Sequence, residues 1–348
     1  MKSNSPVCVT GASGFIGAHI VRELLERGYR VRGTVRKSPE HYPFLLDLPG
    51  AKERLELYRA DLLQAGAYDK AASGCEYVIH TASPYQINVK NPQQDLVDPA
   101  VIGTETVLES CMKANKVKRL ILTSSIAAIT DQPESHKIFT EKDWNIMSSL
   151  DRQPYQYSKT LAEREAWDFI MARRPRFDLV AINPAMVIGP SLSPLLNTTN
   201  QMIRDIMSGV YPCIMDLNWG FVDVRDVAKA HVLAMENDSA SGRYLCSAET
   251  IHLRRIVAIL KSSGFQRYAL PKIDLSGIAG TLLMKLLSFT QPKDTGKYIR
   301  LNVGRSMHYD TSKIKQELSI SFRPFKESLI ETVRDMVTWG HLPPPKEN

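Results

Sequence analysis

A tyrosine and a lysine one helical turn apart lie in the stretch YQYSK, residues 155–159. On a helix, Tyr155 and Lys159 share a face because they are separated by four positions, whereas Tyr157 points elsewhere. A cation beside a phenol favours the phenolate and lowers the phenol pKa from its ordinary value of about 10. Such a phenol can give or take a proton near neutral pH. An ordinary surface helix also produces this spacing, so the surrounding elements must decide between the two interpretations.

A glycine-rich turn near the start of the chain predicts a binding site for a dinucleotide. Residues 7–10 (VCVT) form a predicted buried strand, and GASGFIG follows it with glycines at 11, 14 and 17. A helix with one apolar face is then predicted through HIVRELLERG. Turn glycines let backbone N–H groups approach a pyrophosphate, and the helix N-terminus supplies positive potential. The spacing differs from G-x-G-x-x-G, and the Gly-Lys-Ser/Thr ending of a P-loop is absent.

The end of the second predicted strand carries basic residues. This strand spans residues 29–35, and Arg36 and Lys37 follow it without an acid. In NAD-binding proteins a carboxylate near this place holds the ribose 2′-hydroxyl, whereas a guanidinium pairs with the 2′-phosphate of NADP. The sequence therefore predicts NADP(H) as the cofactor; the alternative is that both basic side chains are simply solvated.

Strands and helices alternate along the rest of this region. Further strands are predicted over residues 55–62, 75–83, 117–129 and 177–190, with helical segments between them. This alternation is typical of a parallel sheet covered by helices on both faces. We therefore predict an α/β fold of the Rossmann type, with a doubly wound parallel sheet.

Composition and charge limit the class of protein. The chain has 348 residues, of which 43% are hydrophobic, and its net charge of +7 suits an anionic ligand. The basic residues are scattered and no nucleic-acid motif is present, so we expect no nucleic-acid partner. Five cysteines lack metal-ligand spacing, which favours reduced thiols, no metal site and a cytoplasmic protein. The apolar stretch 275–289 includes Lys285 and is shorter than a membrane-spanning helix of about 20 residues, so we expect a buried or lid helix, with peripheral membrane contact as the alternative.

Several stretches, in order along the chain, resemble one family. They are VTGASGFIG, VRGTVRK, RADL, HTASPY, PAVIGT, LILTSS, YQYSKTLAEREAWDF, INPAMVIGP and FVDVRDVAKAHVLAME, followed by TSKIKQEL and FRPFKESLIETV. The chain resembles an extended short-chain dehydrogenase/reductase of the dihydroflavonol 4-reductase branch, which includes related aldehyde and ketone reductases. The resemblance implies an NADP-binding domain over residues 1–190 and 221–250. Residues 191–220 and 251–348 would form a smaller, mostly helical C-terminal substrate lobe, in a monomer or homodimer.

This resemblance also implies a catalytic set of serine, tyrosine and lysine. Tyr155 would donate a proton to a carbonyl oxygen, and Lys159 would lower the Tyr155 pKa and hold the nicotinamide ribose hydroxyls. Ser125 would hydrogen-bond the substrate oxygen as negative charge develops, with Ser124 as the alternative serine. Hydride would come from NADPH. The stretch YQYSK is thus expected to be the acid end of a hydride-transfer site.

Further positions are assigned by the resemblance. The cofactor contacts are expected to be Gly11, Gly14, Phe15, Ile16, Arg36, Lys37, Asp61, Leu62, Thr81, Ala82, Ser83, Tyr155, Lys159, Pro184 and Val187. The substrate contacts are expected to be Tyr85, Thr130, Ile188, Met202, Ile206, Met215 and Leu217. His80 and His231 are expected to pack in the interior.

Two departures from the plant members of this branch bear on the substrate. Thr130 stands where plant dihydroflavonol reductases have an asparagine, and the Tyr-Cys-Tyr-Gly-Lys form typical of cinnamoyl-CoA reductases is absent. The stretch SSIAA is more similar to microbial aldehyde and ketone reductases. The expected activity is NADPH-dependent reduction of a ketone or aldehyde with an apolar or aromatic body. The alternatives are a 3β-hydroxysteroid dehydrogenase, an NAD-dependent nucleotide-sugar epimerase or dehydratase, and a non-enzymatic NADP-sensing protein.

Overall fold

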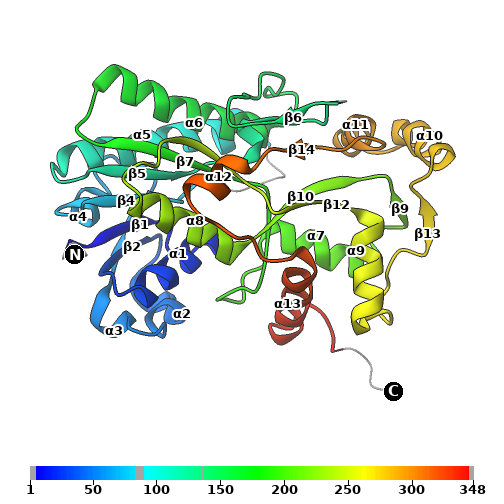
Figure 1. The fold of residues 1–348 in the computed structure, drawn as a ribbon, viewed down its shortest axis with the longest axis horizontal. Helices are drawn as coiled ribbons and strands as arrows, with labels where there is room; N and C mark the ends of the chain where they lie inside the picture. The colour runs from blue at the N-terminus through cyan, green and yellow to red at the C-terminus, as the bar shows by residue number, and fades with distance from the viewer. Residues whose placement is uncertain (1–4, 84–89, 135, 345–348) are drawn as a thin grey trace.

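A parallel sheet of seven strands forms the centre of the larger part of the molecule (Figure 1). The computed structural model describes residues 5–83, 90–134 and 136–344. The strands lie in the order β11-β7-β5-β4-β1-β2-β3, and every neighbouring pair is parallel. Their bounds are β1 Val7–Thr10, β2 Val31–Val35, β3 Leu55–Arg59, β4 Tyr77–His80, β5 Arg119–Thr123, β7 Asp178–Pro184 and β11 Gly242–Cys246. The predicted Rossmann-type sheet is confirmed, and its order reverses between β1 and β4, where such sheets bind ligands beyond the carboxyl ends of the strands.

Helices cover both faces of this sheet, and each face has its own apolar core. Helices α1 (Phe15–Glu26) and α8 (Val224–Glu236) lie side by side on one face, and α5 (Asp98–Lys113) and α6 (Pro154–Arg173) on the other (Figure 1). Because neighbouring strand residues point to opposite faces, Val7 and Val9 pack in the first core while Cys8 packs in the second. Burial on both faces explains why the central strands, such as β1 (VCVT) and β5 (RLILT), are mostly apolar.

A smaller lobe is built from the segments between and after the last strands. It contains a three-stranded sheet of β8 (Met186–Ile188), β10 (Asn218–Asp223) and β12 (Glu249–His252), and a parallel pair of β9 (Cys213–Met215) and β13 (Ile273–Leu275). Its helices are α7 Thr198–Met207, α9 Leu253–Leu260, α10 Ile278–Leu287, α11 Lys293–Asn302 and α13 Phe325–Thr338. These elements have a separate apolar core. The short helix α12 (Ser312–Glu317) instead returns to the large domain, where Ile314 packs in the core beside α1 and α8.

Several short elements connect these parts. They include α2 Pro43–Leu46, α3 Ala51–Arg54, α4 Asp69–Ala72, the 3₁₀ turn η3 Ile126–Ala128, and the strand pair β6 Ile138–Phe139 and β14 His308–Tyr309. The β6–β14 pair joins the region before α6 to the smaller lobe. All five cysteines are buried free thiols.

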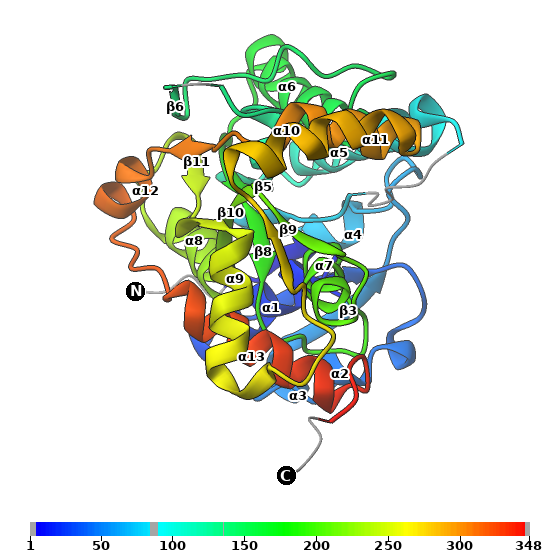
Figure 2. The ribbon, with the colours of Figure 1, turned by 90° about the vertical axis from the view of Figure 1, so that its right-hand side faces the viewer.

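The apolar stretch 275–289 forms α10, which lies next to α11 along the top of the smaller lobe (Figure 2). None of the α10 residues is buried, and Ile278 and Leu286 are 87% and 69% exposed. Of the two expectations for this segment, a buried helix is therefore wrong, and a lid helix stays a prediction. Across the described residues, no helix combines the length and the apolar character needed to cross a membrane.

Candidate active site

The glycine turn after β1 is closely packed against the end of β4. Gly11 has a φ of +66°, and a Cβ atom there would lie 2.8 Å from the backbone nitrogen of Ala82. A Cβ atom on Gly17 would lie 2.2 Å from the Gly11 carbonyl oxygen. No side chain fits at either position, so the turn brings bare backbone to the N-terminus of α1. Gly14, Phe15 and Ile16 from this turn line a cavity of about 690 Å³.

Threonine side chains hold the ends of β1 and β4 together. The Thr81 hydroxyl donates to the Thr10 carbonyl oxygen at 2.7 Å, and the backbone N–H groups of Thr81 and Ala82 donate to Thr10 Oγ1 at 3.2 Å each. Thr10 Oγ1 also bonds His80 Nδ1 at 2.7 Å. Burial lowers the pKa of His80 to about 3, so this histidine is neutral and structural.

Tyr155 and Lys159 lie in the first turns of α6 and line the same cavity. The Lys159 ammonium nitrogen lies 5.9 Å from the centre of the Tyr155 ring and donates to the Ser83 hydroxyl at 2.8 Å. Burial lowers the pKa of Lys159 from 10.5 to about 8. The predicted tyrosine–lysine pair is thus brought beside the end of β4, and its lysine is charged at neutral pH.

The two candidate serines follow β5 and differ in their partners. The buried Ser124 hydroxyl donates to Glu163 Oε2 at 2.5 Å. Ser125 is half-buried and caps the turn η3, where its Oγ accepts from the Ala127 backbone N–H at 3.1 Å. Accepting this bond leaves the Ser125 O–H able to donate, whereas the Ser124 O–H is already used. Both serines contribute to the cavity wall.

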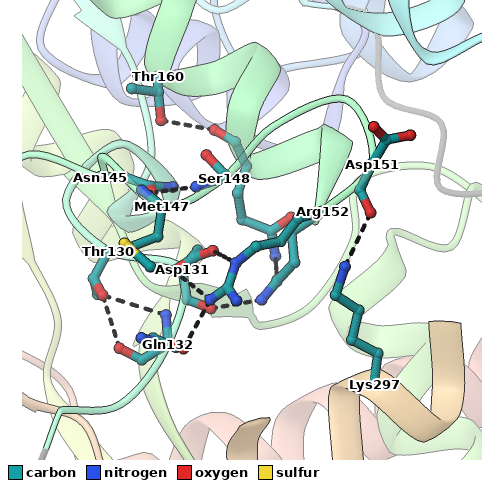
Figure 3. Close-up of polar contacts among 12 residues, drawn as sticks. Thr130, Asp131, Gln132, Asn145, Met147, Ser148, Asp151, Arg152, Thr160 and Lys297 are labelled. Atoms are coloured by element: carbon teal, nitrogen blue, oxygen red, sulfur yellow. Dashed lines mark hydrogen bonds and ion pairs between the residues drawn. The ribbon is translucent and has the colours of Figure 1, made fainter.

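A polar network fixes the chain just before α6 (Figure 3). The buried Asp131 carboxylate pairs with Arg152 Nε at 2.9 Å, and the Gln153 side chain donates to the Asp131 carbonyl oxygen at 2.7 Å. Gln153 has a φ of +52°, which is rare for a residue other than glycine. From the smaller lobe, Lys297 on α11 donates to the Asp151 carbonyl oxygen at 3.0 Å. These bonds define where α6 begins, at Pro154, one residue before Tyr155.

Arg36 and Lys37 follow β2 at the same edge of the sheet as the glycine turn, and both are exposed. Arg36 makes no ion pair with any described residue. Asp61 is exposed after β3, where its carboxylate accepts from the Leu63 backbone N–H at 2.9 Å. A Cβ atom on Gly103 would lie 2.3 Å from Leu62 Cγ, so α5 packs directly on Leu62. These four predicted cofactor positions lie outside the wall of the cavity as far as the chain is described.

The other predicted contacts fall into two groups. Thr81, Ser83, Pro184, Val187, Thr130 and Met202 line the cavity. Ile188, Ile206, Met215 and Leu217 are buried in the core of the smaller lobe and are not part of the cavity wall described here. An apolar side chain is equally suited to a cavity wall and to the core of the lobe. Hydrophobicity alone therefore could not tell which of the predicted substrate contacts would line the cavity. Tyr85 lies outside the described residues.

Aromatic side chains that the sequence did not single out complete the cavity wall. They are Tyr211, Trp219, Tyr298 and Tyr309. The Trp219 indole N–H donates to the Tyr298 hydroxyl at 2.8 Å, which joins β10 to α11. These residues come from four separate segments, so no local motif marks them. The available signal was their position, because Tyr211 and Trp219 fall within the stretch 191–220 expected to line the substrate side.

Comparison with known proteins gives a family for this arrangement. A model described as the NAD dependent epimerase/dehydratase family matches residues 7–246. The chain belongs to this family. It is 46% identical to the cinnamoyl-CoA reductase CAD2 of Medicago truncatula over 265 residues, covering 73% of this chain and 79% of that protein. It is 36% identical to the dihydroflavonol 4-reductase of Arabidopsis thaliana, covering 85% of this chain and 78% of that protein.

Among solved structures, this family member resembles the yeast methylglyoxal/isovaleraldehyde reductase Gre2 complexed with NADPH. The TM-score is 0.80 at 28% identity, covering 97% of this chain and 99% of that chain. The resemblance to the dihydroflavonol 4-reductase branch is therefore confirmed. The Medicago truncatula reductase has a higher identity to this chain than the yeast protein has, 46% against 28%. This holds although the Tyr-Cys-Tyr-Gly-Lys form of the tyrosine motif, typical of cinnamoyl-CoA reductases, is absent here.

Proposed function

We propose that this protein reduces a ketone or aldehyde with an apolar or aromatic body, using NADPH. One observation carries the proposal: Tyr155, Lys159 and Ser125 converge with the glycine turn in one cavity, whose wall also includes the aromatic side chains Tyr211, Trp219, Tyr298 and Tyr309. The relatives named above are reductases, and Gre2 was solved with NADPH. The protein is thus an NADP-dependent oxidoreductase acting on a small molecule.

The residues around the glycine turn fit NADPH. Close packing at Gly11 and Gly17 leaves exposed backbone at the N-terminus of α1, which suits a pyrophosphate. Arg36 and Lys37 stand beyond β2 without an acid beside them and suit a 2′-phosphate. Lys159 would hold the nicotinamide ribose hydroxyls, and Asp61 and Leu62 lie on the side expected for the adenine.

The protein's own groups would then handle the proton. When bound, NADPH supplies the hydride to the carbonyl carbon. Tyr155 would give its phenolic proton to the carbonyl oxygen, and the Ser125 O–H would donate a hydrogen bond to that oxygen as charge develops on it. The Lys159 ammonium beside the Tyr155 ring would stabilise the phenolate that remains.

Two features favour a substrate with an apolar or aromatic body. The cavity wall contains the four aromatic side chains named above and the methionines Met186, Met202 and Met307. Such side chains give a large, adaptable apolar contact area. The reduced state of the five buried cysteines supports a cytoplasmic location, which remains part of the proposal.

The test is NADPH oxidation, followed by absorbance, against aryl and aliphatic aldehydes, small ketones, a dihydroflavonol, a ketosteroid and an acyl-CoA thioester. We expect activity with at least one aromatic or apolar carbonyl, and a loss of about 10²–10⁴-fold in kcat for Tyr155→Phe, the usual contribution of a general acid. Tyr157→Phe is the matched control, because Tyr157 is two positions away and does not line the described cavity wall. Full activity in Tyr155→Phe would contradict the proposed chemistry. A rate only in the oxidative direction on a sterol with NAD would favour the steroid dehydrogenase instead.

A further inference from the structure

A buried ion pair lies behind the cavity, and the proposed chemistry does not use it. Glu163 is on α6, four residues after Lys159, and its side chain has no exposed surface. Arg243 is on β11, with 7% of its side chain exposed, and its Nε lies 2.6 Å from Glu163 Oε1. Neither residue lines the cavity wall that the structure describes. Removing two charges from water costs several kcal/mol per ion, and the attraction between them offsets only part of this cost or little more. A buried ion pair is therefore weak evidence for a role in stability alone.

The Glu163 carboxylate reaches both candidate serines. Its Oε2 accepts from the Ser124 hydroxyl at 2.5 Å and from Asn183 Nδ2 at 2.7 Å. The same Asn183 amide donates to the Ser125 carbonyl oxygen at 3.1 Å. One carboxylate on the tyrosine-bearing helix therefore holds Ser124 directly and holds Ser125 through a single amide.

Arg243 holds the other side of the serine turn. Its guanidinium donates at 3.3 Å to the carbonyl oxygen of Ala128, the last residue of the turn that Ser125 caps. It also donates to the carbonyl oxygens of Glu141 and Asp143, at 3.0 and 2.5 Å, in the segment leading to α6. The Trp144 ring covers the guanidinium at 3.9 Å. All of these acceptors belong to the chain between Ser125 and Tyr155.

We propose that Glu163 and Arg243 form a positioning pair that sets the distance between the Ser125 hydroxyl and the Tyr155 phenol. The two groups lie on different elements, the turn that follows β5 and the helix α6, and both must reach one carbonyl oxygen. Glu163 connects these elements by side-chain bonds, and Arg243 fixes the intervening segment. The inference rests on the proposed function, because it takes Ser125 and Tyr155 as the groups that touch the substrate. A displacement of about 1 Å in such a site can cost about 10²-fold in rate.

Two substitutions that each remove one hydrogen bond to Glu163 test this role. Ser124→Ala cuts the bond to the serine turn, while Trp167→Phe cuts the 3.2 Å bond from the Trp167 indole N–H, on the side away from that turn. We expect Ser124→Ala to lower kcat roughly tenfold with little change in KM for NADPH, because misplaced groups affect the transition state rather than cofactor binding. Trp167→Phe should leave kcat within about twofold, since neutral contacts away from the reacting groups do not change transition-state binding. Equal effects of the two variants on kcat would overturn the proposal.

A double-mutant cycle separates positioning from general destabilisation. If Ser124 acts through Ser125, then Ser124→Ala should cause no further loss of kcat in a Ser125→Ala background, because the group it positions is gone. Additive losses would mean that Ser124 acts independently of Ser125 and would also overturn the proposal. A loss in Ser124→Ala larger than in Ser125→Ala would make Ser124 the catalytic serine, which contradicts the positioning role. Tyr155→Phe, measured in parallel, tests the proposed function separately. If Tyr155→Phe is inactive while Ser124→Ala keeps full activity, the proposed chemistry stands and only the positioning role is rejected.

Discussion

The cavity has two unlike walls. The strand wall is formed at the carboxyl ends of the parallel strands and at the start of α6, and it carries Gly14, Thr81, Ser125, Tyr155 and Lys159. Hydrogen bonds with backbone or buried side chains hold many of its polar groups, as at Thr81 and Ser125. Charges buried nearby reinforce it from behind. This wall is built to keep a few reacting groups at fixed positions.

The lobe wall differs in composition and in origin. It carries Met202, Tyr211, Trp219, Tyr298 and Tyr309, from α7, β10, α11, β14 and a loop. In the part of the chain that the structure describes, a single hydrogen bond joins two of these side chains, from the Trp219 indole N–H to the Tyr298 hydroxyl. Apolar contact tolerates small changes in position better than proton transfer does. Under the proposed function, the strand wall would set the reaction and the lobe wall would select the substrate body.

Arg36→Ala tests the cofactor end of the strand wall and should have the largest effect of the three changes considered next. The guanidinium would lose charge-assisted hydrogen bonds to the 2′-phosphate, so we expect the Kd for NADPH to rise about 10–100-fold. The Kd for NADH, which lacks that phosphate, should stay unchanged. Titration calorimetry with both cofactors measures this difference.

Arg30→Ala provides the matched control, because Arg30 is also an exposed arginine next to β2. It precedes the strand, whereas Arg36 follows it. It should leave both dissociation constants unchanged. Equal weakening of NADPH and NADH by Arg36→Ala would show that Arg36 does not contact the 2′-phosphate.

The pH dependence tests the lysine of the strand wall. Because burial lowers the pKa of Lys159 to about 8, the ammonium is charged below that pH and loses its proton as the pH rises through it. We therefore expect kcat/KM for NADPH, which reports the free enzyme, to fall about tenfold per pH unit above about pH 8. An exposed lysine would place this fall near 10.4.

In Lys159→Arg the falling limb should disappear, because a guanidinium keeps its charge throughout this range. Lys113→Arg, at an exposed lysine on α5, should keep the wild-type limb. A wild-type profile that stays flat to pH 10 would contradict the role given to Lys159.

The two walls also differ in how far the sequence predicts them. The strand wall follows from short motifs: a glycine turn after an apolar strand, and Tyr155 and Lys159 at helical spacing. Local steric and hydrogen-bonding rules determine both, and the βα alternation then brings them to one edge of the sheet. Glu163 lies in the same stretch as Lys159, yet its partner Arg243 is 80 residues away, so only the fold reveals the pair.

The lobe wall follows from no such rule. Ile188 and Ile206 have the hydrophobicity of cavity-lining residues, but they point into the core of the lobe, and Tyr298 lines the cavity from a helix that the sequence did not assign to it. Likewise, α10 is as apolar as a buried helix, although Ile278 is 87% exposed. Whether an apolar side chain faces a core, a cavity or solvent depends on packing between distant segments, which a linear pattern does not record.

Tyr298→Phe tests the lobe wall and should have the smallest effect. It removes the hydroxyl that accepts from the Trp219 indole N–H at 2.8 Å, so the indole loses one hydrogen bond of about 0.5–1.5 kcal/mol. We expect KM for the carbonyl substrate to rise about threefold to tenfold, the same energy expressed as a ratio, with kcat and the KM for NADPH unchanged. Tyr268→Phe is the control, since the Tyr268 hydroxyl likewise makes one hydrogen bond, in which it donates to the Pro343 carbonyl oxygen, but it lies away from the described cavity wall. If Tyr298→Phe instead lowered kcat and left KM unchanged, the lobe wall would share in positioning the reacting groups, and the division between the two walls would fail.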